Sequence, residues 1–370
     1  MQLIQATRDA VLKPLTMVVG IVERRNTLPI LANVLIRKQG GQLEFIANDL
    51  EVQITTRANF GVGDDARATT VAARKLLDIL RALPESGDVR LSLDEAKLTV
   101  QAGRSRFALQ TLDAADYPTV TQSEQWAASF SMPQKALKNL FNQVHFSMAQ
   151  QDIRYYLNGL LLVLEPGRVR AVATDGHRLA HGGVAVEGQE STLDVIIPRK
   201  TIHEMQRLLS DDEQAAVQID VATGQIRFRF DDIEVVSKLV EGKFPDYRRV
   251  IPSGYTRHFD IARDALQAAL QRTAILTTDK LKGVRLQLGD NLLRLSSSNA
   301  EQEEAREELE VDYAQESLDV AFNVSYLLDV LTNIKTDTVR WSVQPDANAS
   351  VLITLPGDEE FKYVVMPMRI

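Results

Sequence analysis

Three stretches of the chain decide the fold because they repeat one pattern: TTVAARKLLDIL at 69–80, LDVIIPRKTIHEM at 193–205 and LDVAFNVSYLLDV at 318–330. Each begins with a short run of β-forming residues and continues into an amphipathic helix. The pattern recurs at intervals of about 125 residues. A repeat of that length is the size of a whole domain, because solenoid units run to roughly 20–50 residues.

The segments between these stretches keep the same order in each third of the chain. A strand leads into a helix at 3–15, 128–140 and 257–270, and a strand pair follows. We expect each third to close on a strand that ends in an aromatic residue or Met before Pro: Tyr117-Pro118, Phe244-Pro245 and Met366-Pro367. We therefore predict three copies of one α+β domain, each with two helices packed on antiparallel sheets. The expected boundaries are 1–126, 127–254 and 255–370.

The composition is that of an ordinary globular protein. The 370 residues are 45% hydrophobic and 25% charged, and cysteine is absent. The lack of cysteine excludes disulfides, thiolate nucleophiles and cysteine-based zinc sites. No apolar run approaches the roughly 18 residues of a membrane span. The polar N-terminus does not resemble a signal peptide. We expect a cytoplasmic protein with no membrane contact.

The distribution of charge matters more than its sum. A net charge of -8 argues against nucleic acid, which is usually bound by Lys and Arg. However, basic residues gather in the helix-bearing segments, whereas acids gather at 211–214 and 299–310. Repeated helices that present base to one side would give a positive inner face on a negative molecule. The alternative is that these are ordinary solvated helix faces.

The stretch ATDGHRLAH at 173–181 has the residue types of an active site. Asp175 and His177 could form an acid–base pair, and His177 with His181 could hold a metal. The two histidines would share a face only on a helix, whereas this stretch reads as strand, Asp-Gly turn and strand. No GxSxG, P-loop or HExxH pattern occurs in the chain. A histidine packed beside the turn is the structural alternative.

Six further stretches show a resemblance to a known family. They are TLPILANVLI, FSMAQQDIRYYLNG, VATDGHRLA, KLVEGKFPDYRRVIP, FNVSYLLDVL and VVMPMRI. In this order, on a threefold domain repeat, they resemble the bacterial DNA polymerase III β subunits, the sliding clamps, over essentially the full length. The resemblance implies a head-to-tail homodimer in which six domains form a ring around duplex DNA. It also implies a non-catalytic processivity factor of the bacterial cytoplasm, without cofactor or metal.

The implied partners are duplex DNA and proteins of replication and repair. They are the polymerase III α subunit, the clamp loader, and other polymerases and repair proteins that carry clamp-binding motifs. The resemblance places their short linear motifs in a pocket between the second and third domains. The implied pocket residues are Leu157, Thr174, Gly176, His177, Arg178, Leu179, Pro245, Arg249, Val250, Asn323, Tyr326, Val364, Met366, Pro367 and Met368. We expect an adaptable apolar floor, with Arg178, Arg249 and Asn323 binding peptide carbonyls or acids.

The resemblance also implies residues that contact DNA. They are Arg25, Arg74, Gln151, Tyr155 and Tyr156. The arginines would contact phosphates, and the tyrosines would stack on exposed nucleotides. Packing at a strand edge is the alternative for the tyrosines. The chain departs from some relatives at Leu281, where they have an aromatic residue.

The implied dimer interface pairs an edge strand of the first domain with the third domain. Its residues are Arg104, Arg106, Phe107 and Leu109 on one side, and Ile275, Leu276, Glu301, Glu303 and Glu304 on the other. Basic and acidic strands around an apolar centre would form a complementary interface. The alternative is that both are solvated edges protected by charge.

Two other functions remain open from the sequence. One is an enzyme that uses Asp175 and His177 as acid and base. The other is an open DNA-binding scaffold that needs no closed ring.

Overall fold

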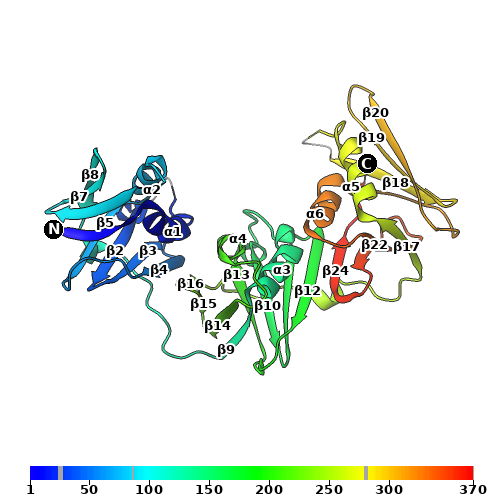
Figure 1. Cartoon of the computed structure of the whole chain (residues 1–370). Helices are drawn as coiled ribbons and strands as arrows, with labels where there is room; N and C mark the ends of the chain where they lie inside the picture. Colours follow the sequence, from blue (N-terminus) through cyan, green and yellow to red (C-terminus); the bar gives the residue numbers. More distant parts are fainter. Residues whose placement is uncertain (24–27, 86, 279–281, 370) are drawn as a thin grey trace. The chain divides into compact units, whose positions relative to one another are not determined.

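The computed structural model describes residues 1–23, 28–85, 87–278 and 282–369. Within these residues one order of elements occurs three times: strand, helix, four strands, helix and three strands. We call each occurrence a module (Figure 1). This confirms the prediction of three repeated domains with two helices each.

The three modules use eight strands and two helices each, among the described residues. The first comprises β1 (Gln2–Thr7), α1 (Arg8–Val19), β2 (Asn33–Gln39), β3 (Gln42–Asn48), β4 (Val52–Ala58), β5 (Ala66–Ala72), α2 (Ala73–Ala82), β6 (Asp88–Asp94), β7 (Lys97–Ala102) and β8 (Ser105–Leu112). The second comprises β9 (Ala128–Pro133), α3 (Gln134–Val144), β10 (Gly159–Glu165), β11 (Arg168–Thr174), β12 (Arg178–Ala185), β13 (Leu193–Pro198), α4 (Arg199–Leu208), β14 (Ala216–Ala222), β15 (Gln225–Phe230) and β16 (Ile233–Lys238). The third comprises β17 (Arg257–Ala262), α5 (Arg263–Ala274), β18 (Gly283–Gly289), β19 (Leu292–Ser298), β20 (Glu304–Glu310), β21 (Leu318–Asn323), α6 (Val324–Asn333), β22 (Thr338–Val343), β23 (Val351–Leu355) and β24 (Asp358–Val365).

The chain divides into two compact units that do not coincide with the modules. Unit 1 is Met1–Gln134 with His203–Leu239, and unit 2 is Lys135–Ile202 with Val240–Ile370. The second module therefore contributes to both units. A sheet continues from one module into the next in each unit. We call the pair of strands at which two modules meet a joint, and each unit contains one complete joint.

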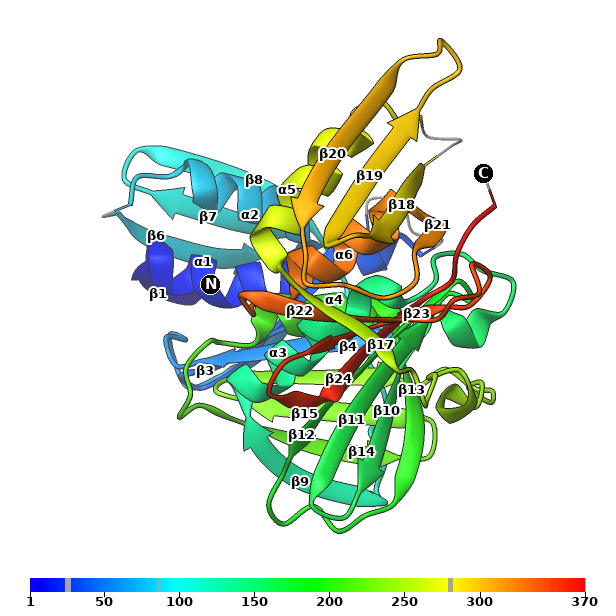
Figure 2. The ribbon, with the colours of Figure 1, turned by 90° about the vertical axis from the view of Figure 1, so that its right-hand side faces the viewer.

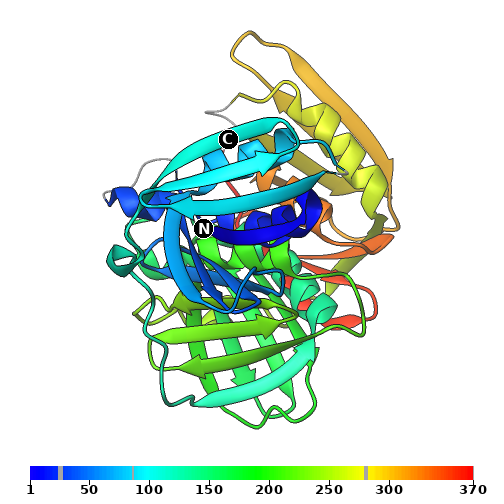
Figure 3. The same cartoon turned by 60° about the vertical axis from the view of Figure 1, so that its left-hand side comes forward.

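Unit 1 contains a twelve-stranded antiparallel sheet in the order β1-β6-β7-β8-β5-β2-β3-β4-β16-β15-β14-β9. The joint between the first two modules is the β4–β16 pair, in which Gln53 faces Val236. In Figure 3 the blue strands of the first module pass into the yellow-green strands of the second. The sequence did not predict that one sheet would run through two modules.

Unit 2 contains an eight-stranded sheet and a four-stranded sheet. The larger has the order β13-β10-β11-β12-β24-β23-β22-β17, and the smaller has the order β20-β19-β18-β21. The joint between the second and third modules is the β12–β24 pair, in which Leu179 faces Val364 (Figure 2). The two joints thus join the same pair of strand positions in each repeat.

The first helix of each module buries an apolar stripe against its sheet. In α1, Val11, Leu15 and Val18 are buried, and the Thr7 hydroxyl accepts a hydrogen bond from the Ala10 amide at 3.4 Å to cap the helix. Counted from the helix starts, Val11 corresponds to Leu137 and Leu266, which are both fully buried. Leu12, which directly follows Val11 in the sequence, is only half-buried. The sequence repeat was therefore offset by one residue here.

The three closing dipeptides are not structurally equivalent, so the prediction that each ends a strand was wrong for two of them. β8 ends at Leu112 and β16 at Lys238, several residues before Tyr117-Pro118 and Phe244-Pro245. Only Met366 directly follows its strand. Tyr117 instead packs against Leu35 and Ile46. The aromatic residues before Pro therefore lie in linkers, whereas the Met before Pro follows a strand, and the similar dipeptides do not mark the same place in the fold.

Of the helices that the structure describes, none is both long and apolar enough to cross a membrane.

Candidate peptide-binding site

The stretch at 173–181 folds as a strand, a turn and a strand, as predicted. β11 and β12 form an antiparallel hairpin in which Thr174 faces Leu179. Gly176 has φ +90°, and a Cβ added to it would lie 3.1 Å from the guanidinium nitrogens of Arg154. The turn therefore requires glycine for both its backbone conformation and the space beside it.

Asp175 holds this turn together and does not orient an imidazole. Its Oδ1 accepts hydrogen bonds from the backbone amides of His177 at 2.9 Å and Arg178 at 3.1 Å. Its Oδ2 accepts one from Nε of Arg178 at 3.0 Å. The carboxylate is thus committed to the turn and to Arg178. This geometry does not favour the acid–base enzyme.

The two histidines of the stretch lie in different environments. His177 is exposed in the turn, whereas His181 is 5% exposed on β12. His181 Nδ1 lies 2.7 Å from the Glu360 carbonyl oxygen, and its ring lies 5.7 Å from that of Tyr247. Burial lowers the pKa of His181, which favours the neutral imidazole. Within the described ranges, no cluster of three His, Asp or Glu residues could hold a metal ion.

Arg178 anchors the turn to the third module. Its Nη1 donates to Oδ2 of Asp329 at 2.6 Å, and its Nη2 donates to the Phe146 carbonyl at 2.6 Å. The guanidinium also lies 4.3 Å from the centre of the Tyr326 ring. Burial alone would lower the pKa of Arg178, but Tyr363 and the two aspartates outweigh it and raise the pKa. Because its side chain is 9% exposed, Arg178 shapes the wall of the site from within.

The floor of the candidate site is apolar and buried. Leu157, Leu179 and Val364 belong to one cluster of packed side chains, which also contains Phe244 and Tyr247. These residues come from separate segments that the β11–β12–β24 sheet brings together. The floor of the site is therefore part of the core of unit 2.

The rim combines exposed apolar groups with one largely exposed arginine. Met366 is 52% exposed and Val250 is 48% exposed. The chain after β24 is fixed on the turn, because the Met366 amide donates to the His177 carbonyl at 2.9 Å. Arg249 has an 87% exposed side chain, which pairs with Asp246 at 3.0 Å. Exposed apolar groups at a fixed rim over an apolar floor are typical of peptide-recognition sites.

The other implied pocket residues also lie in unit 2, some with structural roles. The Thr174 hydroxyl donates to the Arg178 carbonyl at 2.6 Å. The Asn323 side chain accepts from the Ser325 amide at 2.9 Å and caps α6. The Met368 amide donates to the Ala321 carbonyl at 2.8 Å, which fixes the tail that contains Pro367. Pro245 is exposed beside the buried Phe244. Of the three polar residues expected to bind peptide, Arg249 alone is largely exposed.

Sequence reasoning missed three residues that support the site. Asp329 and the Phe146 carbonyl hold Arg178, and Tyr363 donates from its hydroxyl to the Tyr326 carbonyl at 2.8 Å. The alternation in FKYVV could have identified Tyr363 as buried. Nothing in the sequence indicated Asp329, which lies 151 residues from Arg178.

The structure describes four of the five implied DNA-contacting residues. Arg25 lies outside the described residues, as does Leu281. Arg74 is exposed at the start of α2, and its Nη2 donates to the Val22 carbonyl at 2.6 Å. Arg199 makes the equivalent bond to the Met148 carbonyl at 2.9 Å in the second module. Arg74 therefore commits one of the five N–H groups of its guanidinium to a structural bond.

The other residues that the resemblance implies for DNA contact lie on a loop in unit 2. Gln151 is exposed with φ +56°, and Tyr155 is 58% exposed. Tyr156 is half-buried against the apolar cluster of unit 2, and its ring lies 5.8 Å from that of Tyr155, edge-on. The Arg154 guanidinium donates two hydrogen bonds, of 3.0 and 2.8 Å, to the Asp152 carboxylate, and they lower the pKa of that carboxyl to about 2. The loop thus presents Tyr155 on a fixed support.

The implied interface residues lie at two open strand edges. β8 pairs with β5 only through Leu112 and Thr111, so the edge at 105–110 is free within the described chain. β20 pairs with β19 alone among the described strands. The first edge carries the exposed Arg104, Arg106 and Phe107 and the half-buried Leu109. The second carries the exposed Glu301, Glu303 and Glu304, and lies beside α5, which ends near the exposed Ile275 and half-buried Leu276.

Comparison with known proteins gives one consistent family. Residues 1–121, 131–246 and 248–369 match the N-terminal, central and C-terminal domains of the DNA polymerase III beta subunit. The chain is 47% identical over 364 residues to the beta sliding clamp of Pseudomonas putida KT2440, with 98% of both chains covered. It is 41% identical over 365 residues to that of Escherichia coli K12, again with 98% of both covered.

Solved structures agree with the sequence comparison. The crystal structure of the DNA polymerase III subunit beta from Pseudomonas aeruginosa matches with a TM-score of 0.94 at 45% identity, over 100% of both chains. The polymerase III beta of Caulobacter crescentus matches with a TM-score of 0.92 at 38% identity, also over 100% of both chains. The chain therefore belongs to the bacterial DNA polymerase III β subunit family, the sliding clamps, which act in DNA replication as non-catalytic processivity factors.

Proposed function

We propose that two copies of this chain close head to tail into a ring around duplex DNA. The observation that carries the proposal is the pair of open edges on β8 and β20. Every other strand at these two positions of the repeat is paired: β4 with β16, and β12 with β24. A third joint of the same kind would pair β20 of one copy with β8 of a second copy. Such a heterologous contact closes into a ring when the rotation is right.

The repeat also gives the register of this third joint. Gln53, Leu179 and Glu304 are equivalent, because each faces the last residue of the preceding strand. Val236, Val364 and Ala108 are equivalent by their pairing with β15, β23 and β7. Since Gln53 faces Val236 and Leu179 faces Val364, Glu304 would face Ala108 of the second copy.

This register places complementary groups together. Glu308 would face Arg104. Arg306 would face Arg106, and this like-charge pair would be offset by Glu304 and Glu308, which lie diagonally from Arg106 within the reach of long side chains. Ala305 would face Phe107, which is 37% exposed in the single chain. The exposed aromatic ring would thus be covered by the partner, with opposite charges around it, as in complementary interfaces.

The DNA contacts are proposed from the family resemblance, and the exposure of Arg74, Gln151 and Tyr155 supports them. Arg25 and Arg74 would contact phosphates without reading sequence, which permits sliding. Gln151 and Tyr155 would contact nucleotides exposed at a junction, with Tyr156 supporting the ring of Tyr155.

The candidate pocket would take short motifs of partner proteins. Its partners would be the polymerase III α subunit, the clamp loader, and other polymerases and repair proteins. Exposed Met366 and Val250 over the floor of Leu157, Leu179 and Val364 support this. A hydrophobic anchor that buries fully in such a site contributes about 1.5–3 kcal/mol. We place the domain boundaries at 1–126, 127–254 and 255–370, and the protein in the bacterial cytoplasm where its family replicates DNA.

The decisive experiment measures retention on nicked circular DNA after loading by a clamp loader with ATP. A ring should remain on circles and leave after linearisation, because contacts that permit sliding cannot hold it at a free end. Equal retention on circular and linear DNA would mean ordinary contacts and an open scaffold.

The register has its own test, which the absence of cysteine makes clean. Ala108→Cys combined with Glu304→Cys should form disulfide-linked dimers under mild oxidation, since facing residues of antiparallel strands lie within disulfide reach. Ala108→Cys with Glu308→Cys is the matched offset control. Stronger crosslinking of the offset pair would contradict the register while leaving the ring itself to the DNA experiment.

A further inference from the structure

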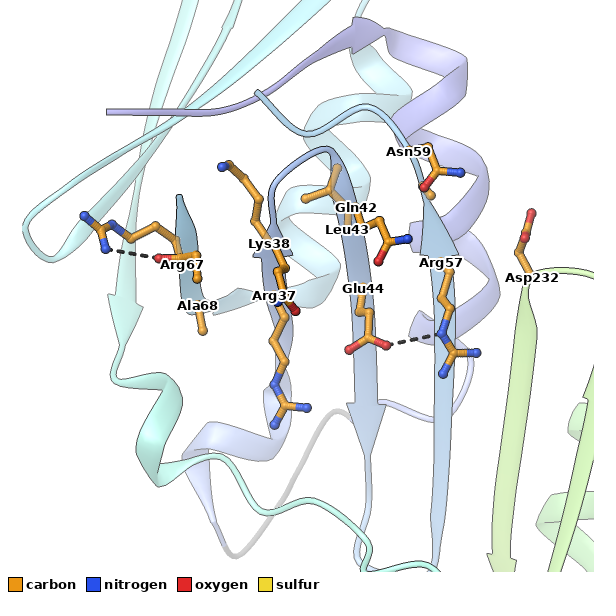
Figure 4. Close-up of a pocket in the computed structure, with 13 residues that line it drawn as sticks. Arg37, Lys38, Gln42, Leu43, Glu44, Arg57, Asn59, Arg67, Ala68 and Asp232 are labelled. Carbon is orange, nitrogen blue, oxygen red and sulfur yellow. Dashed lines mark hydrogen bonds and ion pairs between the residues drawn. The ribbon is translucent and has the colours of Figure 1, made fainter. Parts of the chain in front are cut away.

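A hollow of about 660 Å³ lies on the sheet of the first module, away from every residue assigned above (Figure 4). Strands β2, β3, β4 and β5 and the turn between β15 and β16 line it, all within unit 1. Its charged lining residues are Arg37, Lys38, Glu44, Arg57, Arg67 and Asp232.

The charges alternate across the strands. Arg37 faces Glu44, and Glu44 faces Arg57. The Arg57 amide donates to the Asp232 carbonyl at 2.9 Å, so Asp232 continues the row. Arg57 pairs with Glu44 at 3.2 Å and keeps a 51% exposed side chain.

One cation of this hollow, Arg37, has no ion-pair partner among the residues that the structure describes. Lys38 is fully committed, because its Nζ donates to the Gly63 and Asp65 carbonyls and to the Asp65 carboxylate at 2.8–3.0 Å. Arg67 lies 3.5 Å from the same carboxylate. Arg37 is exposed, and within the described chain no ion pair or hydrogen bond of its guanidinium is found. In Figure 4 no dashed line reaches the Arg37 side chain, whereas one joins Arg57 to Glu44.

The second module shows what occupies the equivalent place there. Gln39 and Glu165 are equivalent, since each ends the strand that pairs with the following hairpin strand. In the second module Glu360 accepts from Arg168 at 2.5 Å and Arg170 at 2.9 Å. The segment around Tyr247 covers this face, with Tyr247 in the apolar cluster and Arg248 lying 3.4 Å from Glu165. This face of the second module thus carries a peptide segment of the chain itself, held by the packing of Tyr247 and by one guanidinium–carboxylate pair, Arg248 with Glu165.

We propose that the hollow of the first module binds an acidic peptide segment of a partner protein. Its carboxylates would pair with Arg37 and with the exposed side of Arg57, which lie two strands or roughly 10 Å apart. The Gln39, Gln42 and Asn59 amides that also line the hollow can hydrogen-bond a peptide backbone.

An acidic peptide fits this hollow better than a nucleic acid strand does. Glu44 and Asp232 stand between and beside the arginines, and a continuous row of phosphates would meet them at each step. A peptide has carboxylates at separate positions and neutral groups between them. This surface goes beyond the proposed ring and pocket, and its contacts are exposed, so the binding would be weak and sensitive to salt.

The test measures fluorescence anisotropy with the full-length protein at low salt. The probe is a fluorescein-labelled octapeptide of alternating Glu and Gly, and the matched probe has Gln in place of Glu. Arg37→Gln should weaken binding of the Glu peptide about five- to tenfold. Arg90→Gln, which removes an exposed arginine of β6 in the same unit, should change it less than twofold. Glu44→Gln should tighten binding, because it releases Arg57.

Three results would overturn the proposal. One is equal weakening by Arg37→Gln and Arg90→Gln, which would indicate net charge alone. Another is equal binding of the Glu and Gln peptides. The third is tighter, Arg37-dependent binding of a labelled thymidine octanucleotide, which would make the hollow a nucleic-acid site. Unchanged melting of Arg37→Gln is expected, because the side chain has no contact to lose.

Discussion

The two joints between modules share one backbone arrangement but differ in what covers them. At the first joint the Lys238 amide donates to the Glu51 carbonyl at 2.8 Å, and at the second the Met366 amide donates to the His177 carbonyl at 2.9 Å. The strand registers are also the same. The scaffold therefore does not explain why one joint is a candidate peptide site and the other is not.

The difference lies in a few side chains and in the linker. At the first joint Gln53 takes the place of Leu179, and its Oε1 accepts from the Val120 amide at 2.9 Å. Asn48 donates to the Pro118 carbonyl at 2.8 Å, so the linker is fixed along the joint. At the second joint the apolar Leu179 lies under the exposed Met366 and Val250. The polar floor hydrogen-bonds the chain's own linker, whereas the apolar floor packs against Phe244 and Tyr247 of its linker and leaves Met366 and Val250 exposed.

The largest effect is expected at the position where the joints differ most in charge. Val52 is fully buried at the first joint, and Arg178 holds the equivalent place at the second. We expect Arg178→Val to lower the free energy of unfolding by about 3 kcal/mol, because it leaves Asp329 and the Phe146 carbonyl without their donor. The melting temperature should fall by roughly 6–12 °C. Arg249→Val, at an 87% exposed side chain, is the control and should leave melting unchanged. Equal melting of both variants would show that the buried network contributes nothing.

The next effect concerns the residues after β24. At the second joint Met366, Pro367 and Met368 follow this strand as a tail, whereas at the first joint β16 is followed by the linker to the third module. Ending the chain after Val365 removes Met366, Pro367 and Met368 from the rim. The affinity for a labelled peptide that carries a polymerase clamp-binding motif should fall about 100-fold, or roughly 2.7 kcal/mol.

The control for this variant ends the chain after Met368. It keeps the bond from Met368 to the Ala321 carbonyl and should bind as the full chain does. Analytical ultracentrifugation should show the same dimer for both. Normal peptide binding by the shorter chain would remove the tail from the site.

The sequence predicted the repeated elements well because each depends on local patterns. The strand-to-helix runs at 69–80, 193–205 and 318–330 became β5–α2, β13–α4 and β21–α6. The sheets that cross modules were not predicted, because pairing of β4 with β16 depends on contacts almost 180 residues apart. No local pattern reports such contacts.

The candidate site was predicted only through the family resemblance. Its residues come from separate segments, and their convergence depends on the fold. The resemblance implied that Arg178 would bind a ligand, but its partner Asp329 lies far away in the sequence and occupies the guanidinium. Burial of Arg178 is therefore a property of the packed joint, and residue type could not reveal it.

A smaller effect is expected from a substitution that makes the first joint resemble the second. Gln53→Leu gives the first joint the floor of the second and leaves the Val120 amide without its acceptor. We expect a loss of about 1 kcal/mol and faster proteolysis within 118–126. Gln122→Leu, which removes a bond to Glu234 but leaves Gln53 in place, tests whether any linker bond has this effect. Equal cleavage of the Gln53→Leu protein and the unmodified chain would show that the linker is fixed by other contacts.

The smallest effect is a pH dependence that only the second joint should have. His181 there corresponds to Thr55 at the first joint, since they face Lys362 and Glu234. Burial lowers the pKa of His181 in the folded chain below the value of about 6.5 in the unfolded chain. The unfolded chain therefore takes up the proton first as the pH falls, and the stability that the neutral ring contributes is lost between pH 6.5 and the folded pKa. Glu360 does not titrate in this range, because Arg170 lowers its pKa further below 4.5. Between pH 7.5 and 5.5, we expect the chain to lose more stability than His181→Thr does. Melting curves of both proteins at the two pH values measure this difference, and parallel losses would assign the pH dependence to other groups.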